Sequence, residues 1–178
     1  MDIEIRDALE SDADILLEIY SHYIRNTAVT FEIDVPSVAE FSERISRTKK
    51  KFPYICAVRG DRILGYAYAG PFIERCACRF SVELSIYVNP NERGCGVGRL
   101  LYETLERRLE EIGIKNMYAH IAVPTCAEDE YLSFDSKKFH ERMGFVTVGK
   151  FTDCANKFGR WYSLVCMEKM LGTKDGEC

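Results

Sequence analysis

The chain has 178 residues, of which 47% are hydrophobic and 29% charged, and its formal net charge at pH 7 is -4. A chain of this length buries about two-thirds of its unfolded surface in one core and is short for two domains. The acidic balance argues against a nucleic-acid-binding protein, which would normally present a basic face. Residues 1–12 lack the apolar core of a signal peptide, and no later segment has the length of a membrane span. We therefore expect a cytoplasmic protein that binds neither nucleic acid nor membrane.

Eight cysteines are many for this length, but their spacing does not repeat. Without an export signal we expect reduced thiols rather than disulfides. Cys76 and Cys78 form the one close pair, which is more typical of ordinary small side chains than of a metal or redox site. We expect no metal.

The first third of the chain predicts one strand and two helices. Residues 3–6 alternate as a strand does, and Ser11-x-x-Asp14 has the form of a helix start. Ser37-x-x-Glu40 has the same form, and the basic residues 49–51 suit the end of that second helix. The residues expected to be buried are Ile15, Leu16, Ile19 and Tyr23 in the first helix and Val38, Phe41 and Ile45 in the second.

The rest of the chain predicts a sheet interrupted by two helices. Residues 54–58, 63–69 and 82–88 are rich in β-branched and aromatic side chains and indicate a three-stranded meander. A helix over residues 98–112 presents Leu101, Leu105, Leu109 and Ile112 on one face and ends at Gly113. A strand at 116–123, a short helix at 136–142 and strands at 145–150 and 161–167 complete the order β-α-α-β-β-β-α-β-α-β-β. We expect one α/β (α+β) domain over residues 1–171 and a tail at 172–178.

Glycines concentrate where the predicted strand 82–88 leads into the helix that follows. Residues 93–98 read Arg-Gly-Cys-Gly-Val-Gly and run directly into the helix. Free backbone N–H groups and the positive end of the helix dipole then converge on one point, which predicts an anion site. The G-x-G-x-G spacing and the lack of an acidic residue at the end of the next strand argue against a dinucleotide site. No Lys-Ser/Thr follows the glycines, which excludes a Walker A loop, and a turn that binds nothing is the remaining alternative.

The loop Arg93-x-x-Gly96-x-Gly98 resembles the pyrophosphate loop of the GCN5-related N-acetyltransferases (GNAT). Further segments resemble the phosphinothricin and methionine sulfoximine acetyltransferase branch, among them residues 30–32 (TFE), 65–72 (GYAYAGPF), 82–88 (VELSIYV), 139–145 (FHERMGF) and 157–161 (KFGRW). The resemblance implies a mixed, mostly antiparallel sheet of about seven strands with about four helices, whose fourth and fifth strands splay apart around acetyl-CoA. It also implies a homodimer. The residues expected to hold CoA are Ile86, Tyr87, Val88, Arg93, Gly94, Cys95, Gly96, Val97, Gly98, Arg99, Asp135 and Ser136, of which Asp135 stands where relatives carry Asn.

The same resemblance implies two catalytic residues. Glu83 is the expected general base, because an alkyl amine has a pKa of about 10 and must lose a proton before it attacks a thioester. The alternative is that Glu83 is an exposed strand carboxylate. His140 occupies the position of a Tyr that relatives often use as an acid toward the thiolate, and the alternative is a histidine that caps or packs beside Phe139. The backbone N–H near Val88 is the expected oxyanion donor.

For the acceptor, the resemblance implies a small amino acid or amino acid analogue. Arg75 and Arg79 are the candidates for gripping its carboxylate, with loop solvation as the alternative, and Phe31, Glu32 and Phe72 are expected to line the pocket. Cys78 replaces the usual Tyr of the family, and Tyr162-Ser163 replaces its usual His-Asp. Two other functions remain open: acetylation of a polyamine, aminoglycoside or protein N-terminus, and a non-catalytic acyl-CoA sensor, which would have no need of Glu83.

Overall fold

The computed structural model describes residues 2–172. Of the predicted tail, 172–178, only Gly172 is among the described residues. The elements are β1 (Glu4–Asp7), η1 (Glu10–Asp12), α1 (Ala13–Asn26), α2 (Val38–Lys49), β2 (Tyr54–Arg59), β3 (Arg62–Pro71), η2 (Cys76–Cys78), β4 (Ser81–Val88), η3 (Pro90–Glu92), α3 (Val97–Glu111), β5 (Asn116–Pro124), α4 (Asp135–Arg142), β6 (Val146–Lys157) and β7 (Arg160–Met170). No helix among these residues is long and apolar enough to cross a membrane.

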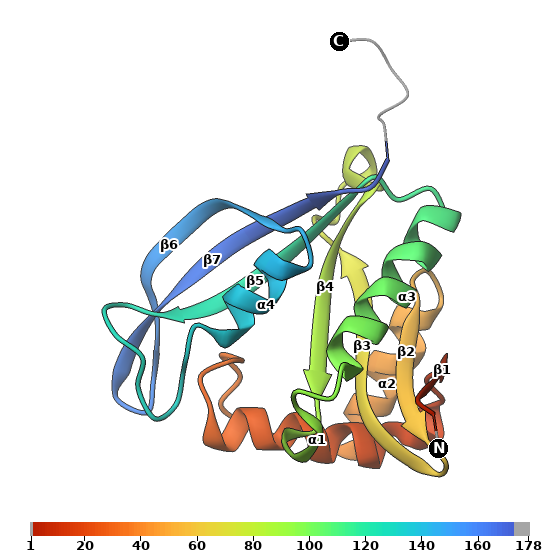
Figure 1. Cartoon of the computed structure of the whole chain (residues 1–178), viewed down its shortest axis with the longest axis horizontal. Helices are drawn as coiled ribbons and strands as arrows, with labels where there is room; N and C mark the ends of the chain where they lie inside the picture. The colour runs from red at the N-terminus through yellow and green to blue at the C-terminus, as the bar shows by residue number, and fades with distance from the viewer. Residues whose placement is uncertain (1, 173–178) are drawn as a thin grey trace.

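The seven strands form one mixed sheet in the order β1-β2-β3-β4-β5-β7-β6 (Figure 1). Neighbouring strands are antiparallel except β4 and β5, which are parallel. The single α/β domain, its seven strands and the predicted order of elements are thereby confirmed. The three-stranded meander is β2-β3-β4.

Helices cover both faces of the sheet because successive side chains of a strand point to opposite sides. On β2, Tyr54 and Cys56 pack with the apolar faces of α1 and α2. Ile55 and Ala57 point the other way and pack with Leu101, Leu105 and Leu109 of α3. Figure 1 shows α4 on the same face as α3 but over the other half of the sheet, above β5 and β7.

Several expectations at the ends of elements were wrong. Ile15 is 39% exposed, Val38 49% and Ile112 53%, because Ile15 and Val38 lie in the first turn of their helices and Ile112 follows the last residue of α3. Ser11 does not cap α1; the helix begins at Ala13, and the carboxylate of Asp12 instead accepts a bond from the Leu9 amide at 2.7 Å. Ser37 does cap α2, since its hydroxyl accepts from the Glu40 amide at 3.2 Å.

Candidate active site

A cleft opens between β4 and β5 because the two strands pair over only three residues each. The paired positions are Ser81–Asn116, Val82–Met117 and Glu83–Tyr118, after which the strands separate. β3 pairs with residues 82–88 of β4, so after Glu83 only the side of β4 that faces β5 is open. The splayed fourth and fifth strands were therefore predicted correctly.

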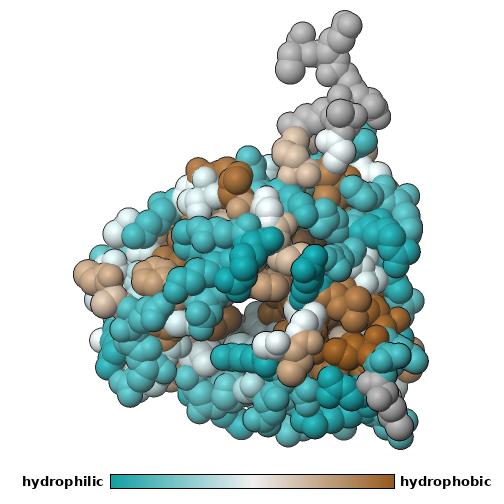
Figure 2. Space-filling view, in the orientation of Figure 1, coloured by the Kyte–Doolittle hydropathy of each residue, from teal (hydrophilic) through white to brown (hydrophobic). Residues whose placement is uncertain are grey.

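Two cavities of about 730 and 320 Å³ fill this cleft and share Val29, Ile86 and Ser136 in their walls. The larger cavity lies beside the glycine loop and α4, and the smaller one lies beside Glu83 and β5. Figure 2 shows the hollow between the half of the molecule that carries α3 and the half that carries α4. The shared walls make the cleft continuous from one cavity to the other.

The glycine loop forms one wall of the larger cavity. Gly94 and Gly96 have φ of 78° and 81°, in the left-handed region, and Gly96 is the N-cap residue of α3. The first amides of a helix have no partner within it, so this end of α3 offers donors and a positive dipole end to an anion. A Cβ at Gly98 would stand 3.4 Å from the ring of Phe139 on α4, so a small residue is needed where the two helices approach.

The predicted CoA residues divide between the two cavities. Tyr87 lines the smaller one, and the thiol of Cys95 donates to the carbonyl of Arg93 at 3.7 Å without lining either. Those that line the larger cavity are Ile86, Val88, Arg93, Gly94, Gly96, Val97, Gly98, Arg99, Asp135 and Ser136.

Ion pairs and hydrogen bonds fix the segment that precedes the glycine loop. Glu92 is 7% exposed, and its carboxylate pairs with Arg59 at 3.3 Å and Arg62 at 3.1 Å. The hydroxyl of Tyr23 donates to the Val88 carbonyl, and the Val88 amide donates back to it at 3.3 Å. The amide expected to serve as oxyanion donor is thus bonded to Tyr23 in this structure, and its role stays a prediction.

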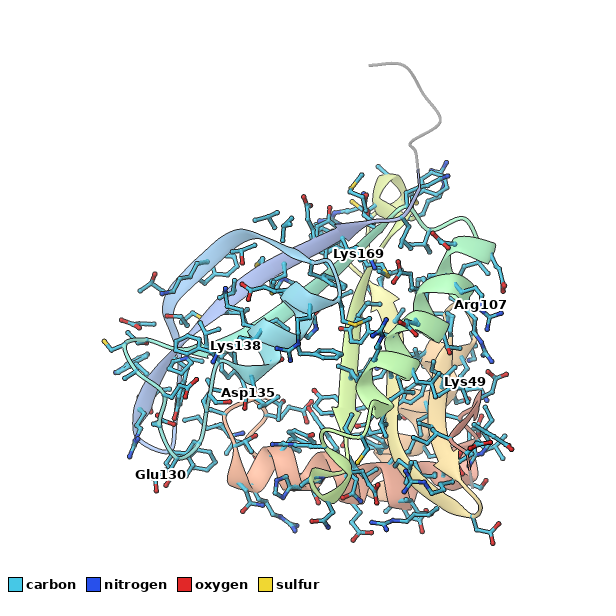
Figure 3. The ribbon with its side chains drawn as sticks, in the orientation of Figure 1. Lys49, Arg107, Glu130, Asp135, Lys138 and Lys169 are labelled. Carbon is cyan, nitrogen blue, oxygen red and sulfur yellow. The ribbon has the colours of Figure 1, made fainter. Side chains whose placement is uncertain are left out.

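Basic and acidic side chains both line the larger cavity. The basic ones, which suit the phosphates of CoA, are Arg93, Arg99, Arg142 and Lys169, and the acidic ones are Glu92, Glu103, Glu106 and Asp135. The Lys169 ammonium on β7 pairs with Glu106 on α3 at 2.7 Å, across the two halves of the sheet. Figure 3 shows Asp135 at the start of α4 and Lys169 on β7. Donor amides, cations and space for a long ligand all fit a CoA arm and pyrophosphate in this cavity.

At the other end of the cleft, Glu83 lines the smaller cavity next to a residue that the sequence did not single out. One carboxylate oxygen of Glu83, Oε1, lies 2.9 Å from Nδ1 of His120 on β5. The two side chains are 38% and 27% exposed, so the pair faces the cavity rather than the core. Phe72 lies beside them, its ring nearly parallel to the imidazole at 6.4 Å between centroids. No signal in the sequence pairs the two residues, because the contact depends on the parallel register that joins Glu83 to Tyr118, two residues before His120.

His140 is 2% exposed, and both of its ring nitrogens have partners. Nδ1 lies 2.7 Å from the Ser136 carbonyl, which can only accept, so Nδ1 carries the proton. Nε2 then accepts from the hydroxyl of Tyr102 at 2.6 Å. Burial lowers the pKa of His140 to about 4, so the ring is neutral at pH 7. Tyr102 and His140 both line the smaller cavity, and Tyr102 was not predicted.

The predicted acceptor residues are not all brought together. Phe31 lines the smaller cavity, but Glu32 pairs with Arg44 of α2 at 2.8 Å. Arg75 and Arg79 are exposed beside η2, where the Arg79 guanidinium lies over the Phe80 ring at 4.3 Å. Neither arginine is among the described residues that line the cavities.

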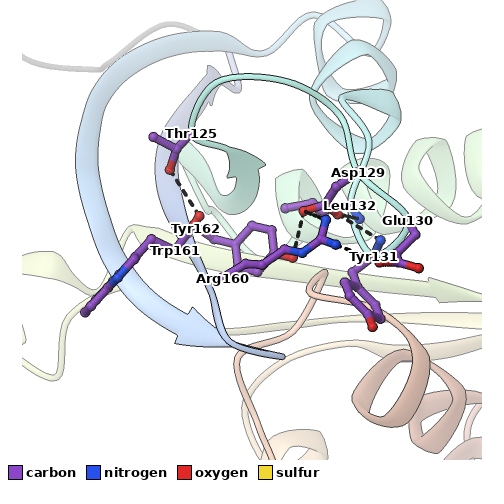
Figure 4. Close-up of polar contacts among 8 residues, drawn as sticks. All are labelled: Thr125, Asp129, Glu130, Tyr131, Leu132, Arg160, Trp161 and Tyr162. Atoms are coloured by element: carbon purple, nitrogen blue, oxygen red, sulfur yellow. Dashed lines mark hydrogen bonds and ion pairs between the residues drawn. The ribbon is translucent and has the colours of Figure 1, made fainter.

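Tyr162, one of the departures from the family pattern, holds the loop that follows β5. Its hydroxyl donates to Asp129 at 3.0 Å, and the same carboxylate accepts from the Tyr131 and Leu132 amides and pairs with Arg160 (Figure 4). Desolvation opposes ionisation of Asp129, but these bonds outweigh it and lower the pKa of the carboxyl. Burial and the bond to Asp129 raise the pKa of Tyr162 to about 12. The Tyr131 carbonyl accepts from the Ala28 amide at 3.0 Å, which ties this loop to the chain beside Val29 in the cavity wall.

Comparison with known proteins agrees with this geometry. An acetyltransferase (GNAT) domain model matches residues 5–165. The chain is 32% identical to phosphinothricin N-acetyltransferase of Streptomyces coelicolor, covering 96% of this chain and 97% of that protein. It is 31% identical to the L-methionine sulfoximine/L-methionine sulfone acetyltransferase of Pseudomonas aeruginosa, covering 94% of each. The crystal structure of a phosphinothricin acetyltransferase from Sinorhizobium meliloti in complex with acetyl-CoA superposes with a TM-score of 0.88 at 34% identity, covering 99% of this chain and 95% of that one.

The chain therefore belongs to the GNAT acetyltransferase family. Within that family its relatives are named for acetylation of amino acids and their analogues. The protein is an enzyme, an acetyl-CoA-dependent amine N-acetyltransferase.

Proposed function

We propose that this enzyme acetylates the primary amine of a small amino acid or amino acid analogue of the phosphinothricin, methionine sulfoximine or methionine sulfone type. One observation carries the proposal: a single cleft joins the glycine-lined cavity, which contains Arg93 and Arg99, to a smaller cavity that contains Glu83. The curated relatives, which are named for these substrates at 31–32% identity, support the choice of acceptor.

The proposed reaction is direct attack of the neutral amine on the thioester carbonyl. The N–C bond forms as a tetrahedral intermediate, the C–S bond then breaks, and CoA leaves as the thiolate. Glu83 is the proposed general base, and a base of this kind contributes about 10²- to 10⁴-fold. It lies at the last paired position of β4, where the cleft begins.

His140 is the proposed acid, and its hydrogen bonds argue against direct proton donation from its ring. A neutral imidazole whose proton is held by the Ser136 carbonyl is a poor direct donor. Its partner Tyr102 lines the same cavity, and its hydroxyl is the group that can turn toward a thiolate. Burial raises the pKa of Tyr102, so we propose that it stabilises the thiolate by a hydrogen bond without giving up its proton.

A second acceptor class is favoured by the charges around the smaller cavity. Among the described residues that line it, Glu83 is the one acidic residue and no Lys or Arg is present. An amine without a carboxylate, such as a polyamine, would suit such a wall better than an amino acid would. For Arg75 and Arg79 to bind the carboxylate of an amino acid, as we propose, the segment around η2 must approach the cleft.

One experiment separates these readings. The protein is incubated with acetyl-CoA and a panel of amines that includes phosphinothricin, methionine sulfone and a polyamine, and release of the CoA thiol is followed. Glu83→Gln should lower turnover of the best acceptor by about a hundredfold or more while acetyl-CoA affinity is kept. Unchanged turnover in that variant would refute the assignment of Glu83, and tight acetyl-CoA binding without release from any amine would favour a sensor.

We also propose that the enzyme is a homodimer. The β6–β7 hairpin supports this, since it exposes Val148 (51%), Phe151 (57%) and Trp161 (59%) to solvent. Apolar side chains gathered on one element are typical of a protein interface. Sedimentation equilibrium would measure the mass in solution.

A further inference from the structure

We propose that His120 is a further catalytic residue, and that its Nε2 takes the proton of the attacking amine while Glu83 holds its Nδ1–H. This inference rests on the proposed function and names the atom that receives the proton. Glu83 then acts as a base through the imidazole.

The sheet places the two side chains on one face of the cleft. Glu83 is directly opposite Tyr118 in the parallel pair β4–β5, and His120 lies two residues further along β5, so the two side chains point to the same side. The strands separate after Glu83, which leaves room for an imidazole beside the carboxylate. Nδ1 and Oε1 approach to 2.9 Å, the distance of a charge-assisted hydrogen bond.

This contact determines the tautomer. An ionised carboxylate can only accept a hydrogen bond, so Nδ1 of His120 carries the hydrogen and Nε2 of the neutral ring has a free lone pair. In that form Nε2 is a base, and the imidazolium produced when it takes a proton is stabilised by the adjacent negative charge. A carboxylate orients and supports an imidazole base in the same way in the catalytic triads of hydrolases.

The surroundings of His120 suit proton transfer. Cys166 on β7 is its direct cross-strand partner, and burial together with the nearby Glu83 raises the pKa of that thiol, which keeps it neutral. Tyr102 from α3 and His140 from α4 line the same cavity, and both are neutral at pH 7. Glu83 therefore supplies the negative charge next to the imidazole. An imidazole also matches the task, because in water it titrates near neutral pH whereas a carboxyl group titrates near 4.

The other histidines do not have this arrangement. His140 donates from Nδ1 to a neutral carbonyl and accepts at Nε2 from Tyr102, so no lone pair is free. His22 on α1 has its Nδ1 near the Asn26 amide at 3.3 Å and lines neither cavity among the described residues.

The test compares His120→Gln with His22→Gln in the full chain. With the best acceptor of the panel, His120→Gln should lower kcat by about a hundredfold or more and keep acetyl-CoA affinity within about threefold. The acidic limb of the pH profile of kcat/KM should also change, because the proposed base must be unprotonated to accept the proton. His22→Gln should retain both turnover and the limb.

A measurement on the wild-type protein does not depend on any variant. Nitrogen-15 NMR of the imidazole should show His120 protonated at Nδ1 and not at Nε2 near neutral pH. The opposite tautomer, or a His120→Gln variant with wild-type kcat and an unchanged acidic limb, would overturn the role of His120 and leave Glu83 as the base. If no amine of the panel leads the wild-type protein to release CoA, the proposed function itself fails. That result differs from the opposite tautomer and from an active His120→Gln variant.

Discussion

Replacing Gly96 with alanine should separate the structural role of the glycine loop from its binding role. Gly96 has φ of 81° and Gly113, just beyond the other end of α3, has φ of 83°. An L-residue in this left-handed region costs about 1–2 kcal/mol. At both positions a Cβ would meet no protein atom within 4 Å, so neither methyl group clashes. Gly96→Ala and Gly113→Ala should therefore lower the unfolding temperature similarly, by about 2–8 °C.

The two variants should differ in affinity for acetyl-CoA. Gly96 lines the larger cavity and Gly113 does not, so only the methyl group at position 96 occupies space next to the amides of α3. Losing one hydrogen bond from a backbone amide to a phosphate costs about 1.5–3 kcal/mol, which weakens binding roughly 10- to 100-fold. Calorimetric titration with acetyl-CoA measures the dissociation constant. Thermal unfolding by circular dichroism measures the loss of stability that both variants should show. Equal dissociation constants in the two variants would refute the placement of the pyrophosphate at this loop.

Two further predictions concern titratable groups whose pKa values are lowered in the folded protein. Asp129→Asn should cost about 1–3 kcal/mol of unfolding free energy at neutral pH, whereas Glu130→Gln, which alters an exposed pair with the same Arg160, should cost less than about 1 kcal/mol. The pKa of Asp129 is lowered by folding, so its contribution to the unfolding free energy is lost as pH falls below the ordinary carboxyl value of about 4. The unfolding free energies of the wild type and of Asp129→Asn, measured by urea unfolding, should converge there. His140, whose pKa is lowered to about 4, should make the protein less stable as pH falls from about 6.5, because the unfolded chain binds a proton that the folded one does not. His140→Gln should flatten this slope between pH 7 and pH 5, and an unchanged slope would show that the buried imidazole is not its source.

The parts of the fold that depend on local pattern were predicted from the sequence. The glycine loop, the helix after it and the order of elements follow from side-chain period and backbone freedom, which neighbouring residues determine. Helix ends were less predictable: whether Ile15 or Ile112 is buried depends on how far the helix extends past the sheet beneath it. Both strands of the last hairpin run longer than expected, β6 to Lys157 and β7 to Met170. Polar residues weaken the alternation in each: Thr152 and Asn156 in β6, and Glu168 and Lys169 in β7.

The candidate site shows the same division. Glu83 could be expected at the cleft from its place a strand's length before the glycines and from the family resemblance, and its catalytic role stays a prediction. His120 and Tyr102 could not, because each meets its partner through long-range geometry: the parallel register of β4 and β5 for one, and the packing of α3 against α4 for the other. Arg75 and Arg79 were inferred from their charge and from their place in the loop before β4, and neither says which way that loop lies.

Because β4 and β5 are joined by only three residue pairs, the two halves of the sheet also depend on contacts outside it, among them the Lys169–Glu106 ion pair and the Tyr102–His140 hydrogen bond. A molecule in the cleft adds contacts to both halves. Acetyl-CoA should therefore stabilise the fold as well as donate the acyl group. Folding stability should rise with its concentration as RT ln(1 + [L]/Kd), and slowed amide exchange should be concentrated along residues 84–87, the part of β4 that faces the cleft.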